Sequence, residues 1–161
     1  MAATTSKKVV IRRFDREPLA GFVNPHNYLQ AGGLELLSTS GVVAVVPYDE
    51  VKAVYFVRDF GADEPAPEKR TFSSRPKTEG LWVRMRFRDG EVMDGLFPNN
   101  LLQLESPGFT FVPPNPSSNS QRVFVPRSAV TEVHVLGVVG SPLRARRAPG
   151  KAKTEQIGLF E

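Results

Sequence analysis

Residues 81–97 read LWVRMRFRDGEVMDGLF, and this stretch decides the fold class of the chain. From Val83 to Arg88, apolar side chains alternate with arginines, which is the period of a β-strand with one apolar face. The dipeptide Asp89-Gly90 follows, and it favours tight primed hairpin turns in which both central residues need positive φ. The stretch therefore predicts a strand, a tight turn and a second strand.

The same pattern occurs earlier in the chain. Residues 9–22, VVIRRFDREPLAGF, align with residues 83–96, and residues 45–57, VVPYDEVKAVYFV, align with residues 124–136, FVPRSAVTEVHVL. Self-similarity of this kind indicates a duplicated structural unit. The equivalent positions are Val9 and Val83, Arg12 and Arg86, Asp15 and Asp89, Glu17 and Glu91, Gly21 and Gly95, Val46 and Val125, Pro47 and Pro126, Val51 and Val130, and Val54 and Val133.

The two copies differ in their first hairpin. The earlier one lacks the turn glycine and carries Arg13 at the position of apolar Phe87. We therefore expect its first strand to bulge or to end early.

Three further strands are expected in each copy. A short apolar segment follows a glycine at residues 34–36 and again at 109–111, and each predicts a third strand. The fourth strand ends at Pro47 or Pro126, because proline removes a hydrogen-bond donor from the ladder. A single helical turn then leads into the fifth strand.

Five short strands with one helical turn before the last are typical of a small SH3-like barrel. The pattern resembles the Sm-like (Sm/Hfq) family in the acidic turn and glycine of the first hairpin and in the Val-Pro-x-x-x-Val-x-x-Val close. The resemblance implies an all-β fold of two tandem five-stranded SH3-like (Sm-like) small barrels, with a short helical turn before each last strand. It also implies RNA binding by a ring, which three such chains would complete.

The RNA-contacting motifs of the Sm-like family are not matched here. The corresponding segments read NPHNYLQ at residues 24–30, PNNLLQ at 98–103, VPYDE at 46–50 and VPRSA at 125–129. The family's RNA-binding residues are therefore not carried over.

The repeat divides the chain into four segments. We expect a first small β-barrel at residues 8–58 (copy one), a linker or arm at 59–80, a second small β-barrel at 81–137 (copy two) and a basic flexible C-terminal tail at 138–161. A unit of about 60 residues is marginally stable alone, so we expect the copies to pack together or the chain to form a homo-oligomer.

Composition excludes several classes of protein. The 161 residues include no cysteine, so neither disulfides nor thiolate sites are expected. The formal charge is +4, and residues 138–161 hold five basic and two acidic side chains, which leaves the rest of the chain nearly neutral. No segment approaches the roughly 20 apolar residues of a membrane span. We expect a cytoplasmic protein that does not bind membranes.

Catalytic signatures are missing from the sequence. The chain contains no glycine-rich phosphate loop, nucleophile elbow or cluster with metal-ligand spacing. Its two histidines, His26 and His134, lie at positions that do not correspond between the copies. We expect no enzyme, no cofactor and no metal.

The alternating arginines suggest a binding surface. Side chains two apart on a strand stand about 7 Å from each other, so Arg84, Arg86 and Arg88 could face a polyanion together. Alternatively, Glu91 and Asp94 on the paired strand neutralise them. In the linker, cations alternate with an aromatic residue, which either grips an anion or, as we favour, docks on a barrel. The candidate binding residues are Trp82, Arg84, Arg86, Arg88, Arg70, Phe72 and Arg75.

The tail carries two further candidate sites. Its cationic run suits sequence-independent contact with phosphates through Arg144, Arg146, Arg147, Lys151 and Lys153, although it could simply solubilise the chain. Its end, with Gln156, Leu159 and Phe160, resembles the Gln-x-x-Leu-Phe peptide that binds the bacterial sliding clamp. The resemblance implies two apolar anchors in a pocket of that clamp.

Three functions remain open from the sequence. The first is a non-enzymatic binding or assembly module built from the duplicated barrel. The second is a nucleic-acid-associated accessory protein that uses the basic tail and the clamp-binding-like peptide. The third is an RNA-binding ring. Whether the partner is a protein or a nucleic acid stays undecided at this point.

Overall fold

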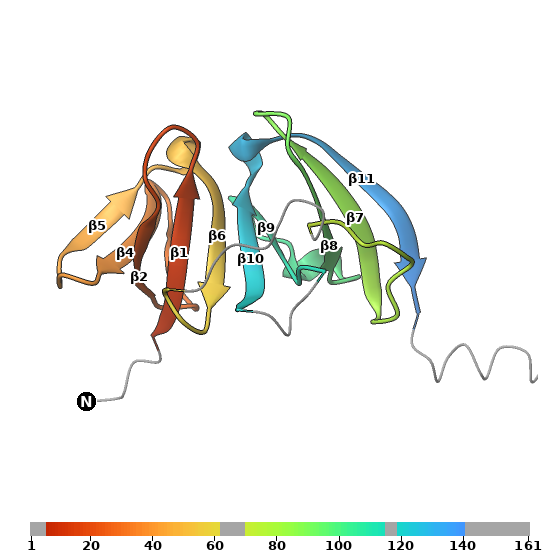
Figure 1. The fold of residues 1–161 in the computed structure, drawn as a ribbon, viewed down its shortest axis with the longest axis horizontal. Coiled ribbons are helices and arrows are strands. Elements are labelled where there is room, and N and C mark those ends of the chain that lie inside the picture. Colours follow the sequence, from red (N-terminus) through yellow and green to blue (C-terminus); the bar gives the residue numbers. More distant parts are fainter. Residues whose placement is uncertain (1–5, 62–69, 115–118, 141–161) are drawn as a thin grey trace, which may run out of the picture.

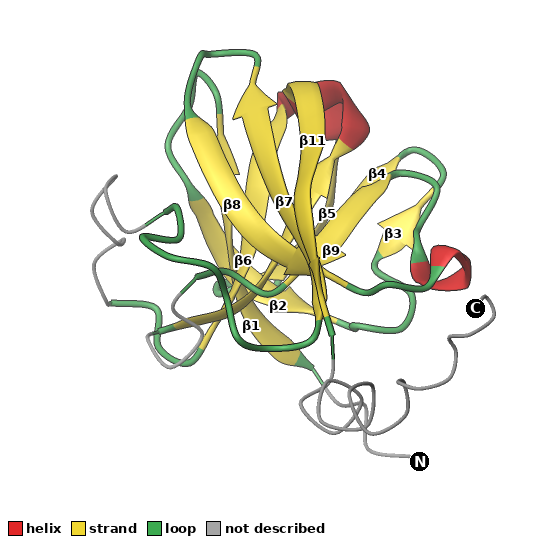
Figure 2. Ribbon diagram, turned by 90° about the vertical axis from the view of Figure 1, so that its right-hand side faces the viewer, coloured by secondary structure: helices red, strands yellow, loops and turns green. Residues whose placement is uncertain are grey.

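A computed structural model describes residues 6–61, 70–114 and 119–140, and these residues form an all-β protein. Two lobes of strands lie side by side (Figure 1). The helices drawn between the strands are single short turns (Figure 2). All strand pairs in the two sheets are antiparallel.

Copy one begins with the hairpin expected from its sequence. In chain order its elements are β1 (Lys7–Arg13), β2 (Leu19–Val23), β3 (Leu29–Gln30), β4 (Gly33–Ser38), β5 (Val43–Val46), the 3-10 turn η1 (Tyr48–Glu50) and β6 (Val51–Val57). The register of β1 against β6 shifts between Arg12 and Arg13, which confirms the predicted irregularity at Arg13.

Copy two follows the same plan, except that its described residues include no equivalent of the two-residue β3, a sixth strand of copy one that the sequence did not predict. Its elements are β7 (Gly80–Phe87), β8 (Val92–Phe97), the 3-10 turn η3 (Leu101–Gln103), β9 (Gly108–Phe111), β10 (Ser120–Pro126), the 3-10 turn η4 (Arg127–Ala129) and β11 (Val130–Val139). The turns η1 and η4 stand directly before β6 and β11, where the sequence predicts a helical turn. Strand β11 runs two residues beyond the boundary expected at residue 137.

Strand order is shared by the two copies. In copy one the order is β6-β1-β2-β4-β5. In copy two β11-β7-β8 form one sheet, and β9 pairs with β10. The two backbone hydrogen bonds of the Leu96–Val112 bridge, at 2.9 and 3.0 Å, join β8 to the end of β9. The last strand of each copy therefore lies beside its first, β6 beside β1 and β11 beside β7.

A closed barrel is not found among the described residues, and the expectation of barrel closure is corrected here. Strand β10 pairs with β9 on one side and with β6 on the other, so it has no edge left for β11. Strand β6 pairs with β1 and β10, so it has no edge left for β5. Pairing between the copies takes the place of the pairing that would close each copy.

The turn between β7 and β8 also differs from the prediction. Gly90 has φ 95°, whereas no non-glycine residue in the described part has positive φ. Phe87 N donates to Glu91 O at 2.8 Å, and Gly90 N donates to Phe87 O at 2.9 Å. The loop is thus a three-residue turn that ends in a left-handed glycine, and the primed two-residue turn was a wrong prediction.

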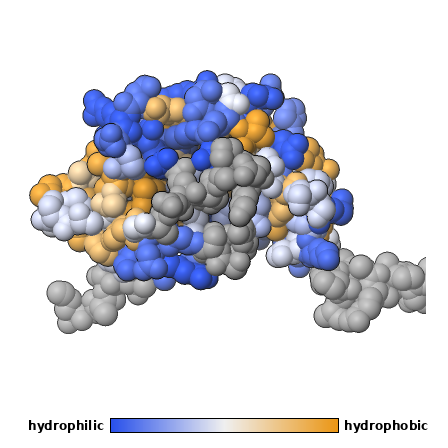
Figure 3. Space-filling view, in the orientation of Figure 1, coloured by the Kyte–Doolittle hydropathy of each residue, from blue (hydrophilic) through white to orange (hydrophobic). Residues whose placement is uncertain are grey.

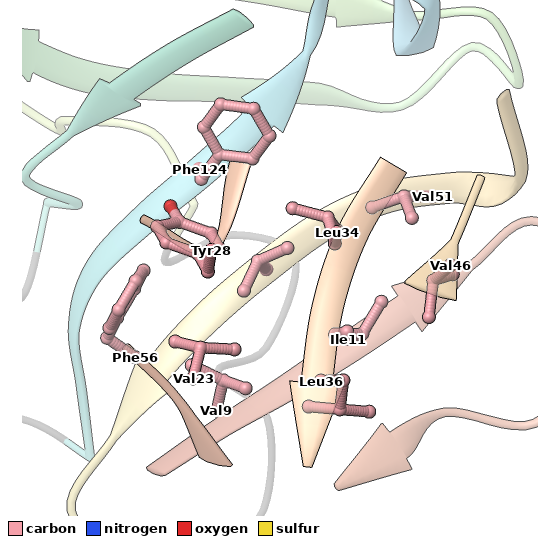
Figure 4. Packing of buried hydrophobic residues seen from close by; sticks show 11 residues of the cluster. Val9, Ile11, Val23, Tyr28, Leu34, Leu36, Val46, Val51, Phe56 and Phe124 are labelled. Carbon is pink, nitrogen blue, oxygen red and sulfur yellow. The ribbon is translucent and has the colours of Figure 1, made fainter. Parts of the chain in front are cut away.

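The two copies share their cores across the β6–β10 pair. Phe124 of β10 is fully buried in the core of copy one, where Figure 4 shows its ring beside Tyr28. In return, Ala53 of β6 is buried in the core of copy two. Each hydrophobic core is therefore completed by a residue of the other copy.

Equivalent glycines make equivalent contacts in the two copies. A Cβ at Gly33 would overlap the carbonyl oxygen of Val46, and a Cβ at Gly108 would overlap that of Val125. Val46 and Val125 are themselves equivalent in the sequence alignment. The start of β4 therefore approaches the end of β5 in copy one, and the start of β9 approaches the end of β10 at the same place in copy two.

Among the described residues, no helix is long and apolar enough to cross a membrane.

Candidate functional site

Asp94 organises most of the candidate binding residues of copy two. It lies on β8 with no exposed surface, opposite Arg84 of β7. Its carboxylate accepts hydrogen bonds from Arg84 Nε at 2.7 Å, Arg84 Nη2 at 3.0 Å, Phe72 N at 2.9 Å and Trp82 Nε1 at 3.3 Å. The hydrogen bond to Asp94 raises the pKa of Arg84.

The end of the linker docks on the same cluster. Asp94 N donates to Arg70 O at 2.8 Å, and the Arg70 side chain forms an ion pair with Glu91 at 2.8 Å. The ring of Phe72 packs edge-on against Trp82 with centroids 6.2 Å apart. The structure therefore brings Arg70, Phe72, Trp82 and Arg84 together, in contacts that hold the linker to the sheet.

The other three candidates lie apart from this cluster. Arg86 faces Glu132 of β11 at 3.7 Å, with both side chains about half exposed. Arg88 donates to the carbonyl oxygens of Ser128 and Asp49 and stacks on Phe14, 3.9 Å from the ring centroid. Arg75 Nη2 donates to Val138 O at 2.7 Å. The three alternating arginines thus have separate partners.

A second set of charges ties the two copies together. Lys52 of β6 forms ion pairs with Asp89 and Glu91 of the β7–β8 hairpin. The hydrogen bond from Lys52 lowers the pKa of Glu91. Burial alone would raise the pKa of Asp89, but hydrogen bonds from Lys52 and from Glu91 N outweigh it and lower that pKa. These carboxylates therefore remain charged at neutral pH.

A groove lies at the junction of the copies. It has a volume of about 450 Å³ and is lined by apolar side chains, including Tyr28, Phe97 and Phe111, with Glu105 and Arg122 among its charged residues. Burial raises the pKa of the Tyr28 hydroxyl, so this group stays neutral. A second hollow of about 260 Å³ shares Tyr28 and Glu105 with the groove, which extends it along the junction.

The ends of the molecule expose apolar strand edges. At one end, Val43 and Val45 of β5 are 59% and 56% exposed. At the other, Val133 and Val135 of β11 are 39% and 58% exposed. Figure 3 shows hydrophobic surface over the end that β4 and β5 form. Within the described residues, β5 pairs with β4 and β11 with β7, and neither has a partner on its outer edge.

Sequence reasoning missed these edges as a site. The signal was present, because GVVAVVP at residues 41–47 and VHVLGVV at 133–139 hold no acidic residue, no lysine and no arginine. Natural proteins protect free edges with charges, so an uncharged valine-rich edge is a candidate for pairing with another strand. The tail candidates Arg144, Arg146, Arg147, Lys151, Lys153, Gln156, Leu159 and Phe160 lie outside the described residues.

Chemically, the arrangement suits pairing and packing. The described part of the chain holds no group of three or more histidine, aspartate or glutamate side chains placed to ligate a metal. What it offers instead is two apolar strands, β5 and β11, that lack a strand partner on their outer edges, and a groove at the junction of the copies.

Comparison with known proteins identifies one related group. Residues 5–137 match the model of a family whose description is a family of unknown function (DUF6982). No curated protein and no solved structure matches the chain.

Proposed function

We propose that this chain, which belongs to the DUF6982 family of unknown function, is a non-enzymatic assembly module made of two SH3-like units. It acts by adding its free strand edges to the edge of a protein partner. The β6–β10 pair is the observation that carries this proposal, because it is such an edge-to-edge joint formed within one chain.

Several features support the SH3-like description of each unit. Both copies have the same strand order, and both have a 3-10 turn before the fifth strand. The contacts of Gly33 and Gly108 are equivalent as well. Strands β6 and β10 use one edge each to pair with the other unit, whereas the outer edges of β5 and β11 have no partner in the described residues.

Strand addition needs an edge with unpaired backbone groups and side chains that fit a partner. Main-chain hydrogen bonds then supply affinity, and alternate side chains supply specificity. Strands β5 and β11 meet both needs, because their outer edges are unpaired in the described structure and carry exposed valines. Arg84 and Arg86 of β7 are engaged with Asp94 and Glu132, and Arg88, just after β7, is engaged with Ser128 O and Asp49 O, which favours a protein partner over a polyanion on that face.

Affinity capture of the tagged chain from native lysate tests this proposal. The arms are the full chain, the edge variant Val43→Lys/Val135→Lys, a control variant Leu102→Lys and a chain that ends at residue 140, each with and without nuclease. Leu102 is 94% exposed and lies in η3, outside both edges. We expect association that survives nuclease and removal of the tail and is lost in the edge variant.

Two results would contradict the assembly module. Loss of all association on nuclease treatment would favour the nucleic-acid-associated accessory protein or the RNA-binding ring. Loss on removal of residues 141–161, with the edge variant unaffected, would favour the basic tail and the peptide with Gln156, Leu159 and Phe160.

A further inference from the structure

The internal joint works by insertion of one side chain. On β10, Phe124 stands opposite Thr110 of β9, on the face that points away from the core of copy two. It stands opposite Val54 of β6 in the core of copy one, and its ring centroid lies 6.1 Å from that of Tyr28 (Figure 4). Phe124, on the outward face of β10, thus packs on the apolar surface beside β6 that the side chains of Val54 and Phe56 form; this surface is called the socket of copy one.

Copy two has the equivalent apolar surface on β11, and no strand of the described residues covers it. Val133 stands opposite Met85 and Val135 opposite Val83, so both valines share a face with buried core residues of β7. The valines are nevertheless 39% and 58% exposed. Their equivalents in copy one, Val54 and Phe56, are 0% and 7% exposed because β10 covers them.

Copy one has β5 as the equivalent of β10, and in the described residues β5 has no neighbouring strand on its outer edge. By the repeat alignment, Val45 is the equivalent of Phe124. Val45 stands opposite Glu35 of β4, on the face that points away from the core of copy one, and it is 56% exposed. Val43, two residues earlier, is 59% exposed on the same face.

We propose that β5 of one copy of this chain pairs antiparallel with the outer edge of β11 of a second copy, with Val45 opposite Val133 and Val43 opposite Val135. The register is that of the internal joint, where Phe124 stands opposite Val54 and Arg122 opposite Phe56. This inference rests on the proposed function and names the partner as a second copy of the chain.

The composition of the two edges supports this choice of partner. No pair of like charges is formed, because Val43 and Val45 would face the β-branched Val135 and Val133, and Ala44 would face His134. Such pairs stabilise antiparallel strands, and pairing removes the exposed edges. Since the two edges are different surfaces, the contact is head-to-tail, and it builds a ring where the rotation closes and a filament where it does not.

Mass measurement of the purified full chain by light scattering tests the inference. We expect a mass above that of one chain, rising with concentration or constant at a closed multiple. Val43→Lys, which blocks β5, and Val135→Lys, which blocks β11, should each reduce the mass to that of one chain. The control Leu102→Lys, at an exposed position outside both edges, should leave the assembly intact, and circular dichroism should show that every variant is folded.

Mixing the two blocked variants gives the sharper result. The Val43→Lys chain retains β11 and the Val135→Lys chain retains β5, so together they can form one joint and no more. We expect a species of twice the mass of one chain in the mixture, and single chains in each variant alone.

Cysteine pairs test the register, because the natural chain has no cysteine. Val45→Cys in the Val135→Lys chain and Val133→Cys in the Val43→Lys chain should form a disulfide when mixed, since opposed residues in antiparallel strands lie within disulfide range. Ala44→Cys in place of Val45→Cys should not, because it points to the opposite face.

Three results would overturn the inference. The wild-type chain could remain a single chain at all concentrations. It could remain so in full length but assemble when it ends at residue 140, which would make its own C-terminal segment the occupant. The mixture could fail to form the double-mass species. If edge-dependent capture from lysate persists in any of these cases, the assembly module stands and the partner is another protein.

Discussion

Asp94 is a buried carboxylate whose charge is matched by donors alone. Arg84, Trp82 and Phe72 N all donate to it, so the site suits an ionised acid and no other side chain of similar size. The pair with Arg84 joins β7 to β8, and the contact with Phe72 N fixes the end of the linker. The negative charge of Asp94 thus fixes the position of the linker end at Phe72.

Asp94→Asn should lower the free energy of unfolding by about 1–3 kcal/mol. The substitution replaces one accepting oxygen by an amide NH2 donor, and this donor would face other donors without an acceptor. Urea denaturation followed by the fluorescence of Trp82, the single tryptophan, measures this. Glu132→Gln is the control, since its pair with Arg86 is half exposed and should contribute less than about 1 kcal/mol. Equal effects of the two substitutions would rule out the special role of Asp94.

Gly95 is required by packing on β8. A Cβ at this position would overlap the ring of Phe111, which is buried and stacked on Phe97 at 5.2 Å between centroids. Gly95→Ala should therefore destabilise the chain by about 1–3 kcal/mol through overpacking. Gly32→Ala, where a Cβ would meet open space, provides the comparison in the same denaturation experiment. A similar stability for both variants would show that Phe111 moves aside freely.

At the scale of elements, β10 is the strand that makes one molecule of two copies. It pairs with β9 in copy two and with β6 in copy one, and its alternate side chains enter both cores. Val123 and Val125 lie in the core of copy two, while Phe124 lies in that of copy one. The strand alternation that usually separates core from solvent here separates one core from another.

Phe124→Ala should lower the free energy of unfolding by about 3–5 kcal/mol, because it removes a fully buried ring and leaves a cavity beside Tyr28 and Val54. Differential scanning calorimetry should show one lowered transition for both copies, since each core contributes to the other. Leu104→Ala, at a position 39% exposed, should change stability little. Separate unfolding of the two copies in the wild-type chain would disprove the shared core.

At the scale of the whole molecule, charges reinforce the joint. Lys52 of copy one binds Asp89 and Glu91 of copy two, and both carboxylates have lowered pKa values in the folded protein. A lowered pKa stabilises the folded state above the unfolded pKa, and this stabilisation is lost as the pH falls through the folded pKa. Acid should therefore weaken the contact between the copies.

The urea midpoint should fall as the pH drops below the ordinary pKa values of 4.5 for glutamate and 3.8 for aspartate. Lys52→Met should reduce this dependence, because the carboxylates then lose the partner that holds their protons off. Lys77→Met, on the exposed segment before β7, serves as the matched loss of one positive charge. An acid dependence unchanged in Lys52→Met would show that other carboxylates cause it.

Several features of the fold could be predicted because they are local. The alternation from Val83 to Arg88 gave β7, and the proline at position 47 or 126 gave the end of a fourth strand, as chemistry near in the sequence sets both. The Arg84–Asp94 pair was within reach for the same reason, since a hairpin fixes which residues face each other. The turn type was wrong because an aspartate and a glycine fit both a primed turn and a three-residue turn.

By itself, the sequence determined the all-β class, the order of the strands along each copy apart from the two-residue β3, and the exclusion of cysteine chemistry. These follow from period, turn residues and composition, which act over a few neighbouring positions. Only the tertiary structure decided that β10 pairs with β6, that Phe124 packs in the core of the other copy, and that β5 and β11 have no partner on their outer edges within the described residues. Strand pairing between distant segments depends on which hydrogen-bonding edges remain after the local hairpins form, and no single stretch of sequence records that.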